Sequence, residues 1–204
     1  MTVWEHISLP DADVRMARGF LPRDVGQTCF TALRDSVDWR RDRIRVFGRS
    51  HPIPRLHQWY GDPGTDYRWS GLCMHPQRWT DVLARVRDQV GVATGCRFNS
   101  VLVNLYRDGE DSMGWHADNE PELGDEPVIA SVSLGAERDF TLRRRDRRGS
   151  TEKLPLPHGS LLIMAGPTQR HWQHALPKRR RVREPRINLT FRYCMPSAAR
   201  AGAA

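Results

Sequence analysis

The sequence has no apolar run long enough to cross a membrane. Its longest apolar stretches, around residues 101–105 and 161–165, span only a few residues, whereas a transmembrane helix needs about 20. The opening segment, MTVWEHISLPDADV, carries acidic side chains where a secretory signal needs a basic stretch followed by a continuous apolar one. These absences predict a protein with no membrane partner that stays in the cytoplasm, at the nucleoid if it is bacterial.

Cysteine is scarce and irregularly spaced. No two of the four cysteines form a C-x-x-C pair, which argues against a structural zinc ribbon and gives no sign of a disulfide framework. The four are Cys29, Cys73, Cys96 and Cys194. We interpret them as ordinary reduced thiols.

Acidic residues are outnumbered by basic ones. The chain has 24 Asp and Glu against 32 Lys and Arg, a formal net charge of +8. The excess is concentrated in residues 143–148 and 178–181. Such runs indicate a polyanionic partner, for which nucleic acid is the natural candidate. Solvated loops that serve only solubility would produce the same pattern, so charge alone leaves both interpretations open.

Hydrophobic spacing predicts two helices in the first half of the chain. Val25, Phe30 and Leu33 recur near helical spacing. They follow Pro22, a residue that is tolerated at the start of a helix. Within residues 76–92, apolar side chains fall on one stripe and charged side chains on the opposite face.

From residue 99 onward the pattern changes to short strands separated by glycines. The expected strands are residues 100–106, 127–134, 139–144, 160–165 and 186–193. This order predicts an α+β fold: a double-stranded β-helix (jelly-roll) core with the N-terminal helices packed on one sheet. A chain of 204 residues suits one domain. We expect helices within residues 1–98, the jelly roll over 99–193 and a frayed tail over 194–204.

Three residues suggest a metal site. In an extended segment, alternate side chains point to the same side, so His116 and Asp118 would face one site, and His174 could supply a third ligand. Two histidines and one carboxylate with the other side open are typical of non-haem iron(II) oxygenases. Zinc with a bound hydroxide accepts the same ligands. His158 and His171 are rival third ligands.

Residues 186–192 alternate strictly between apolar and polar side chains. If this strand is internal to a sandwich, burying Arg186 and Arg192 is costly unless an anion accompanies them. A dicarboxylate ligand would resolve that conflict, whereas an edge strand with a solvated polar face is the alternative. Asn104 and Tyr106 share one side of a second apolar strand. Both strands would therefore direct hydrogen-bonding groups into one cavity.

Six motifs then occur in a fixed order along the chain. They are Asn104-x-Tyr106, His116-x-Asp118, residues 130–135 (ASVSLG), residues 159–162 (GSLL), His171-Trp172-x-His174 and residues 186–192 (RINLTFR). In this order they resemble the AlkB family of alkylation-repair dioxygenases, most closely the branch that includes the animal duplex-DNA repair enzymes. The resemblance covers roughly residues 44–192.

The resemblance implies roles for individual residues. Iron(II) would be held by His116, Asp118 and His174. The residues that would bind 2-oxoglutarate are Asn104, Tyr106, Arg186, Asn188 and Arg192. The damaged base would be held by Tyr67, Trp69 and Glu120, with Trp69 standing where the family carries Phe. A hairpin finger with Phe47 at its tip and Arg45 and Arg49 on its flanks would contact nucleic acid, as would Arg55.

The chemistry of a base-modifying enzyme agrees with these roles. Such enzymes take a base out of the stack or act on single strands, and an aromatic face favours a cationic base such as 1-methyladenine or 3-methylcytosine. The resemblance implies oxidative demethylation of N-alkylated bases in DNA, with iron(II), 2-oxoglutarate and O2, releasing formaldehyde and succinate. We expect a monomer acting on methylated DNA. The alternatives are an oxygenase acting on RNA or protein, and a non-catalytic nucleic-acid-binding jelly roll.

Overall fold

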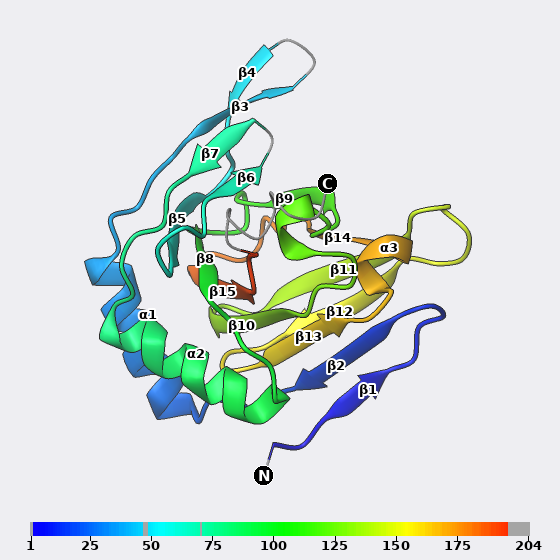
Figure 1. The fold of residues 1–204 in the computed structure, drawn as a ribbon, viewed down its shortest axis with the longest axis horizontal. Helices are drawn as coiled ribbons and strands as arrows, with labels where there is room; N and C mark the ends of the chain where they lie inside the picture. Colours follow the sequence, from blue (N-terminus) through cyan, green and yellow to red (C-terminus); the bar gives the residue numbers. More distant parts are fainter. Residues whose placement is uncertain (1, 47–48, 70, 196–204) are drawn as a thin grey trace.

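The computed structural model describes residues 2–46, 49–69 and 71–195, and two antiparallel sheets face each other within them (Figure 1). The larger sheet has seven strands. In spatial order they are β1 (Glu5–Ile7), β2 (Asp13–Ala17), β13 (Leu161–Ala165), β10 (Ile129–Gly135), β15 (Arg186–Arg192), β8 (Ser100–Tyr106) and β5 (Leu56–Gly61).

The smaller sheet has four strands. In spatial order they are β12 (Glu152–Leu156), β11 (Arg138–Arg144), β14 (Trp172–Leu176) and β9 (Met113–His116). From β8 to β15 the chain passes from one sheet to the other at every step except the β11–β12 hairpin. This alternation is the jelly-roll topology that the sequence predicts.

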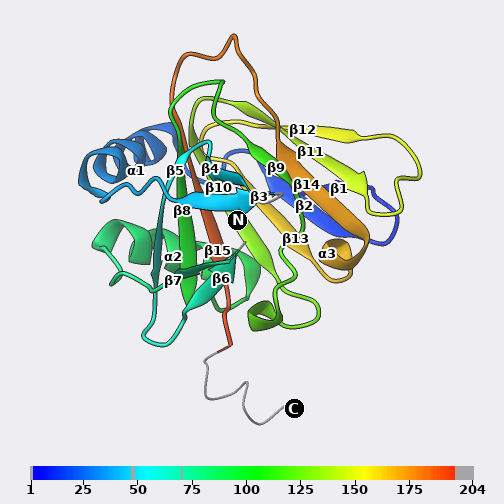
Figure 2. The same ribbon diagram turned by 90° about the horizontal axis from the view of Figure 1, so that it is seen from above.

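Two helices cover the outer face of the larger sheet, α1 (Arg23–Ser36) and α2 (Asp81–Thr94) (Figures 1 and 2). α2 begins later than the spacing predicts, because the Thr80 side chain accepts a hydrogen bond from the Leu83 N–H and caps the helix. It ends at Gly95, whose positive φ of 70° suits a residue without a Cβ. A shorter helix, α3 (Thr168–His171), precedes β14.

Two apolar cores follow from this layering. One lies between the helices and the larger sheet and includes Leu33, Leu83 and Leu189. The other includes Trp59 and Leu142 and fills the space between the two sheets. No helix of the described residues has the length and apolar character that crossing a membrane requires.

Strand β15 is central rather than an edge. It pairs with β10 on one side and β8 on the other, and all of its residues are buried. Ile187, Leu189 and Phe191 belong to the core under the helices. The opposite face, which carries Arg186 and Arg192, therefore looks into the interior between the sheets. The edge-strand alternative is wrong for this strand.

The N-terminal part is less helical than the sequence predicts. β1 and β2 extend the larger sheet beside β13, and β5 forms its other edge. Two hairpins, β3 (Arg43–Val46) with β4 (Arg49–Pro52) and β6 (Tyr67–Trp69) with β7 (Leu72–Met74), complete the first half. These strands have three to six residues, too few to reveal a period, and long-range pairing sets their conformation.

The expected tail also starts too early. Cys194 is fully buried, and its backbone N–H donates to Asn99 Oδ1 at 2.7 Å. The Met195 N–H donates to the Glu122 carbonyl at 2.8 Å. Packing therefore continues to residue 195, and residues 196–204 of the predicted tail lie outside the described part of the chain.

Candidate metal centre and co-substrate pocket

Three predicted ligands meet between the sheets. His116 ends β9, and His174 lies opposite it on the neighbouring strand β14, while Asp118 follows β9 in the chain. His116 Nε2 and His174 Nε2 each lie 3.9 Å from an oxygen of the Asp118 carboxylate. One ligand atom from each residue falls within 4.8 Å of the others. The spacing suits a single metal ion bound on one side.

Hydrogen bonds fix the orientation of the ligands. His116 Nδ1 lies 2.9 Å from the Gly114 carbonyl. A carbonyl only accepts, so Nδ1 carries the proton and Nε2 is left with a lone pair for a metal. The Asp118 backbone N–H donates to Gln169 Oε1 at 2.9 Å. The His174 ring stacks on Phe140 with ring centroids 5.1 Å apart.

Electrostatics keep the three ligands in their metal-binding forms. Burial lowers the pKa of His174 to about 3, with a further contribution from His116, and burial also lowers the pKa of His116. Burial by itself would raise the pKa of Asp118. The Arg192 guanidinium and the two histidines outweigh burial and lower that pKa to about 2. At neutral pH the site offers two neutral imidazoles and one carboxylate.

A cavity opens beside these ligands and is lined by the predicted co-substrate residues. They are Asn104, Tyr106, Arg186, Asn188 and Arg192. Arg186 donates to Ser133 Oγ at 2.9 Å, and Arg192 donates to Asp118 Oδ1 at 3.0 Å. Arg186 Nε and Arg192 Nε and Nη1 are buried without a hydrogen-bond partner. Buried guanidinium donors of this kind fit a carboxylate ligand.

The two guanidinium groups differ in their electrostatic surroundings. Burial lowers the pKa of Arg186 to about 10, a value at which the group is still charged at neutral pH. Burial also opposes the charge of Arg192, but Asp118, Tyr67 and Glu120 outweigh it and raise the pKa of Arg192. Arg186 is therefore the cation with less anionic compensation and the stronger need for an acidic ligand.

Asn188 lines the cavity, but protein groups already occupy its amide. Its Nδ2 donates to Ser131 Oγ at 2.7 Å and to the Val132 carbonyl at 3.2 Å, while Oδ1 accepts from Thr190 Oγ1 at 2.8 Å. Ser131 and Thr190 also line the cavity, and the sequence analysis did not select them. The alternation of serines in residues 129–135 is the signal that could have identified Ser131.

The predicted base-binding residues Tyr67 and Glu120 lie together beside the metal ligands. Tyr67 and Glu120 lie close enough to shift each other's pKa, and the Arg192 guanidinium lies 5.3 Å from the Tyr67 ring centroid. Trp59, which sequence reasoning missed, stacks on Tyr67 with centroids 4.9 Å apart. Burial, and next the charge of Asp118, raises the pKa of Glu120. Base contact by Tyr67 and Glu120 stays a prediction. The Trp69 side chain lies outside the described part.

The predicted finger coincides with a hairpin that projects from the body of the molecule, β3–β4 (Figure 1). Arg49 is exposed on β4. Arg45 belongs to β3, but its side chain is outside the described part, as is the whole of Phe47. The position suits an outward-reaching element, and the contacts of the three residues with nucleic acid stay predictions.

Arg55, predicted to contact nucleic acid, is buried beside the cavity. Its side chain is only 2% exposed, and Nε donates to Asn104 Oδ1 at 2.7 Å. β5 places His57 opposite Asn104 on β8, so the residue just before β5 lies against the cavity wall. The pairing of two distant strands thus buries a residue that is usually exposed, and contact of Arg55 with DNA stays a prediction.

The rival histidines serve other purposes. His158 Nδ1 accepts from the Gly135 N–H at 2.9 Å, and Nε2 lies 3.2 Å from the Arg23 carbonyl, so the ring joins α1 to β10. His171 ends α3. Within the described residues, only His116, Asp118 and His174 form a cluster suited to a metal.

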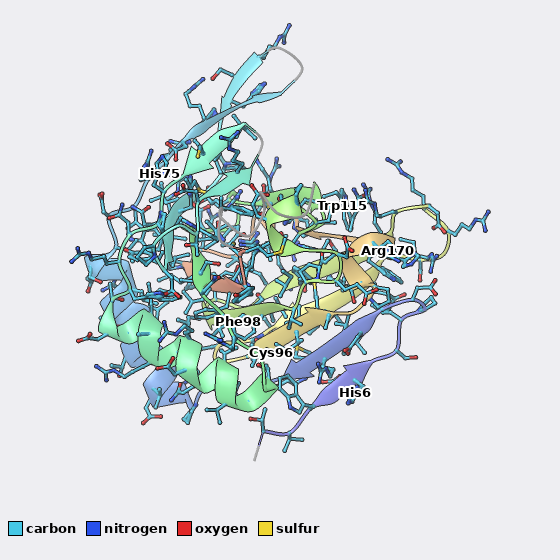
Figure 3. The ribbon with its side chains drawn as sticks, viewed as in Figure 1. His6, His75, Cys96, Phe98, Trp115 and Arg170 are labelled. Carbon is cyan, nitrogen blue, oxygen red and sulfur yellow. The ribbon has the colours of Figure 1, made fainter. Side chains whose placement is uncertain are left out.

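The two basic runs are partly neutralised by acidic neighbours. Arg144 pairs with Asp11 at 2.8 Å, and Arg179 pairs with Asp139 at 3.2 Å. Arg143 stacks over Trp115, 4.1 Å from its ring centroid. In Figure 3, Trp115 lies on the side of the molecule away from the two helices. Other members of the runs remain exposed, namely Arg145, Arg147, Arg148 and Arg181.

Fold and site together define a class of protein. A double-stranded β-helix with two histidines and one carboxylate at an open site is the arrangement of non-haem iron(II) oxygenases. The buried guanidinium groups beside the ligands add a cavity suited to an acidic co-substrate.

Comparisons with known proteins agree. Residues 13–192 match the family model of the 2OG-Fe(II) oxygenase superfamily. Human DNA oxidative demethylase ALKBH2 is 50% identical over 199 residues, which cover 93% of this chain and 76% of that protein. Human alpha-ketoglutarate-dependent dioxygenase alkB homolog 3 is 46% identical over 188 residues, 87% of this chain and 65% of that protein. The chain therefore belongs to the 2OG-Fe(II) oxygenase superfamily and, within it, to the AlkB family.

Two further matches define the limits of the comparison. Bovine DNA oxidative demethylase ALKBH2 is 49% identical over 165 residues, and the match covers 78% of this chain but only 59% of that protein. The solved structure of OsALKBH1 superposes with a TM-score of 0.64 over 93% of this chain and 99% of the other, at 17% identity. At that identity the likeness confirms the fold alone.

Proposed function

We propose that this chain is an iron(II)- and 2-oxoglutarate-dependent dioxygenase that demethylates N-alkylated bases in DNA. The observation that carries the proposal is the opening of the His116, Asp118 and His174 cluster into a cavity where Arg186 and Arg192 keep unpartnered, buried donors. Relatives named DNA oxidative demethylase that are about half identical to the chain support it. The match to the 2OG-Fe(II) oxygenase superfamily argues against the alternative of a zinc-dependent hydrolase.

The chain's own residues have distinct tasks in this proposal. His116, Asp118 and His174 hold iron, and the two arginines neutralise the carboxylates of 2-oxoglutarate. Tyr106 adds a hydroxyl to the same cavity. When bound, iron, 2-oxoglutarate and O2 supply the oxidation of the N-methyl carbon, after which formaldehyde leaves the base. No general base from the protein is required.

On the substrate side, Tyr67 and Glu120 lie close to each other and to Asp118 and Arg192, where they can hold a flipped base. We assign Trp69 to the same task. Arg45, Phe47 and Arg49 of the projecting hairpin engage the nucleic acid.

Methylated DNA is the partner we favour, and the chain acts as a monomer in the cytoplasm or at the nucleoid. RNA is the second candidate, because the exposed arginines would bind either phosphate backbone. A non-catalytic role is disfavoured because all three metal ligands are present and converge.

The deciding experiment measures formaldehyde release from 1-methyladenine in duplex DNA, single-stranded DNA and RNA of one sequence. We expect release that requires both iron(II) and 2-oxoglutarate and is fastest on DNA. The control is the same protein with zinc in place of iron. Release with zinc, or no release from any substrate, would overturn the proposed activity, and faster release from RNA would overturn the assignment to DNA.

A further inference from the structure

Arg55 and Asn104 form a buried pair at the wall of the cavity. Arg55 Nε donates to Asn104 Oδ1 at 2.7 Å, and the two side chains are 2% and 4% exposed. A guanidinium has donors only, so the atom of Asn104 that faces it must be the oxygen. The bond thus determines which end of the carboxamide is oxygen and which is nitrogen, an assignment that is otherwise difficult for an asparagine.

The orientation decides what Asn104 can offer to the cavity. With Oδ1 held by Arg55, the amide nitrogen and its two hydrogens are the polar group left for a ligand. A nitrogen donor attracts a carboxylate, whereas the oxygen of a reversed amide would repel it. Asn188, the cross-strand neighbour of Asn104 on β15, has its amide hydrogens committed to Ser131 and Val132. Asn104 is therefore the asparagine whose donors remain for a ligand.

Arg55 also remains charged in its buried position. Burial lowers its pKa, but Tyr106 and Asp111 act in the opposite direction. Arg192, which does line the cavity, lies near enough for its positive charge to lower the pKa of Arg55 further.

We infer that Arg55 is a positioning residue for the acidic co-substrate: it orients the Asn104 carboxamide so that its N–H groups face the ligand. The inference rests on the proposed function, which supplies 2-oxoglutarate as the ligand. It assigns Arg55 to the co-substrate side of the site rather than to contact with DNA.

The test is a double-variant cycle in which the affinity for 2-oxoglutarate is measured. Arg55→Met, Asn104→Ala and the combined variant are loaded with Mn(II), and 2-oxoglutarate affinity is measured by calorimetry. Arg55→Met should weaken binding about tenfold, the loss expected for one charge-assisted hydrogen bond. The combined variant should bind within about twofold of Asn104→Ala, since Arg55 acts through Asn104.

Arg49→Met is the matched control, because Arg49 lies on the exposed strand β4. It should weaken binding of a methylated duplex, measured by fluorescence anisotropy, and leave 2-oxoglutarate affinity unchanged. Arg55→Met should weaken 2-oxoglutarate binding and leave duplex binding unchanged. Arg55→Lys keeps a buried cation and a donor, so it should bind 2-oxoglutarate more tightly than Arg55→Met. If Arg55→Met does not fold, Arg55→Lys replaces it in the double-variant cycle.

Two outcomes overturn the inference. One is unchanged 2-oxoglutarate affinity in Arg55→Met and Arg55→Lys, with duplex binding weakened as in Arg49→Met. The other is additive losses in the combined variant. Failure of the proposed function looks different, because the Mn(II)-loaded parent protein itself would then not bind 2-oxoglutarate.

Discussion

Arg192 Nη2 lies 3.0 Å from Asp118 Oδ1, and both side chains are buried. The residue predicted to bind the co-substrate therefore also bonds to a predicted metal ligand. The pair joins the two halves of the site: it keeps the Asp118 carboxylate ionised, and the carboxylate in turn stabilises the buried guanidinium. A change to either residue should affect both metal and co-substrate binding.

Two replacements of Asp118 should both abolish activity but should lower the free energy of unfolding by different amounts. Asp118→Ala leaves Arg192 buried and unpaired, a loss of about 3–5 kcal/mol when one member of such a pair is removed. Asp118→Asn keeps an oxygen that can accept from Arg192, so its unfolding free energy should stay closer to that of the parent. Both variants should release no formaldehyde, since the anionic ligand is gone. Urea unfolding alongside the formaldehyde assay checks this, and full turnover in either variant contradicts the metal assignment.

Arg186→Ala and Arg192→Ala should have different consequences. Arg186 donates to Ser133 and has no carboxylate partner among the residues that the structure describes. Its loss should therefore weaken 2-oxoglutarate binding while Mn(II) affinity stays the same. Arg192→Ala should weaken both, because Asp118 loses the cation that keeps its pKa low. Calorimetric titration of each variant with Mn(II) and then 2-oxoglutarate separates the two. Equal Mn(II) affinity in both variants would count against the coupling.

His57 should make the stability of the metal-free protein depend on pH. Its side chain is 3% exposed, and burial, followed by the charge of Arg55, lowers its pKa from 6.5 to about 4. In the unfolded chain His57 binds a proton below pH 6.5, whereas in the folded chain it stays neutral until about pH 4. Stability from this group is thus complete above pH 6.5 and is lost as pH falls, by up to about 1.4 kcal/mol per pH unit.

His57→Gln removes that titration and should flatten the dependence between pH 6.5 and 4. Unfolding free energies measured across this window for the parent and the variant check it. The half-buried His116 and the buried His174 keep part of the slope in both proteins. If the unfolding free energies of the parent and the variant changed with pH in the same way, the pKa of His57 would be the same in the folded and unfolded protein.

Phe47→Ala should depress repair of a methylated duplex much more than repair of the same lesion in a single strand. Extracting a base from a duplex costs a few kcal/mol, and an apolar wedge can offset part of that cost. Arg49→Ala, on the same projecting hairpin, should weaken binding to both substrates. Initial rates on the two substrates and a melting curve provide the measurement. Equal losses on both would indicate a structural role for Phe47.

The sequence by itself determined the parts of the site that lie within single strands. Alternation in residues 186–192 placed Arg186 and Arg192 on one face, and this inference succeeded because the period of a strand is a local property. The spacing of His116 and Asp118 predicted two neighbouring ligands on one extended segment, but β9 ends at His116, and Asp118 reaches the site from the segment that follows. The order of motifs was sufficient to identify the family.

Tertiary structure decided which distant segments became neighbours. β5 lies beside β8 in the register that sets His57 opposite Asn104, and this pairing buried Arg55 against the cavity rather than exposing it to DNA. It also stacked Trp59 on Tyr67 and committed the Asn188 amide to Ser131. Strand pairing and side-chain contacts of this kind depend on hydrogen bonds between residues far apart in the chain, whose partners no local pattern specifies.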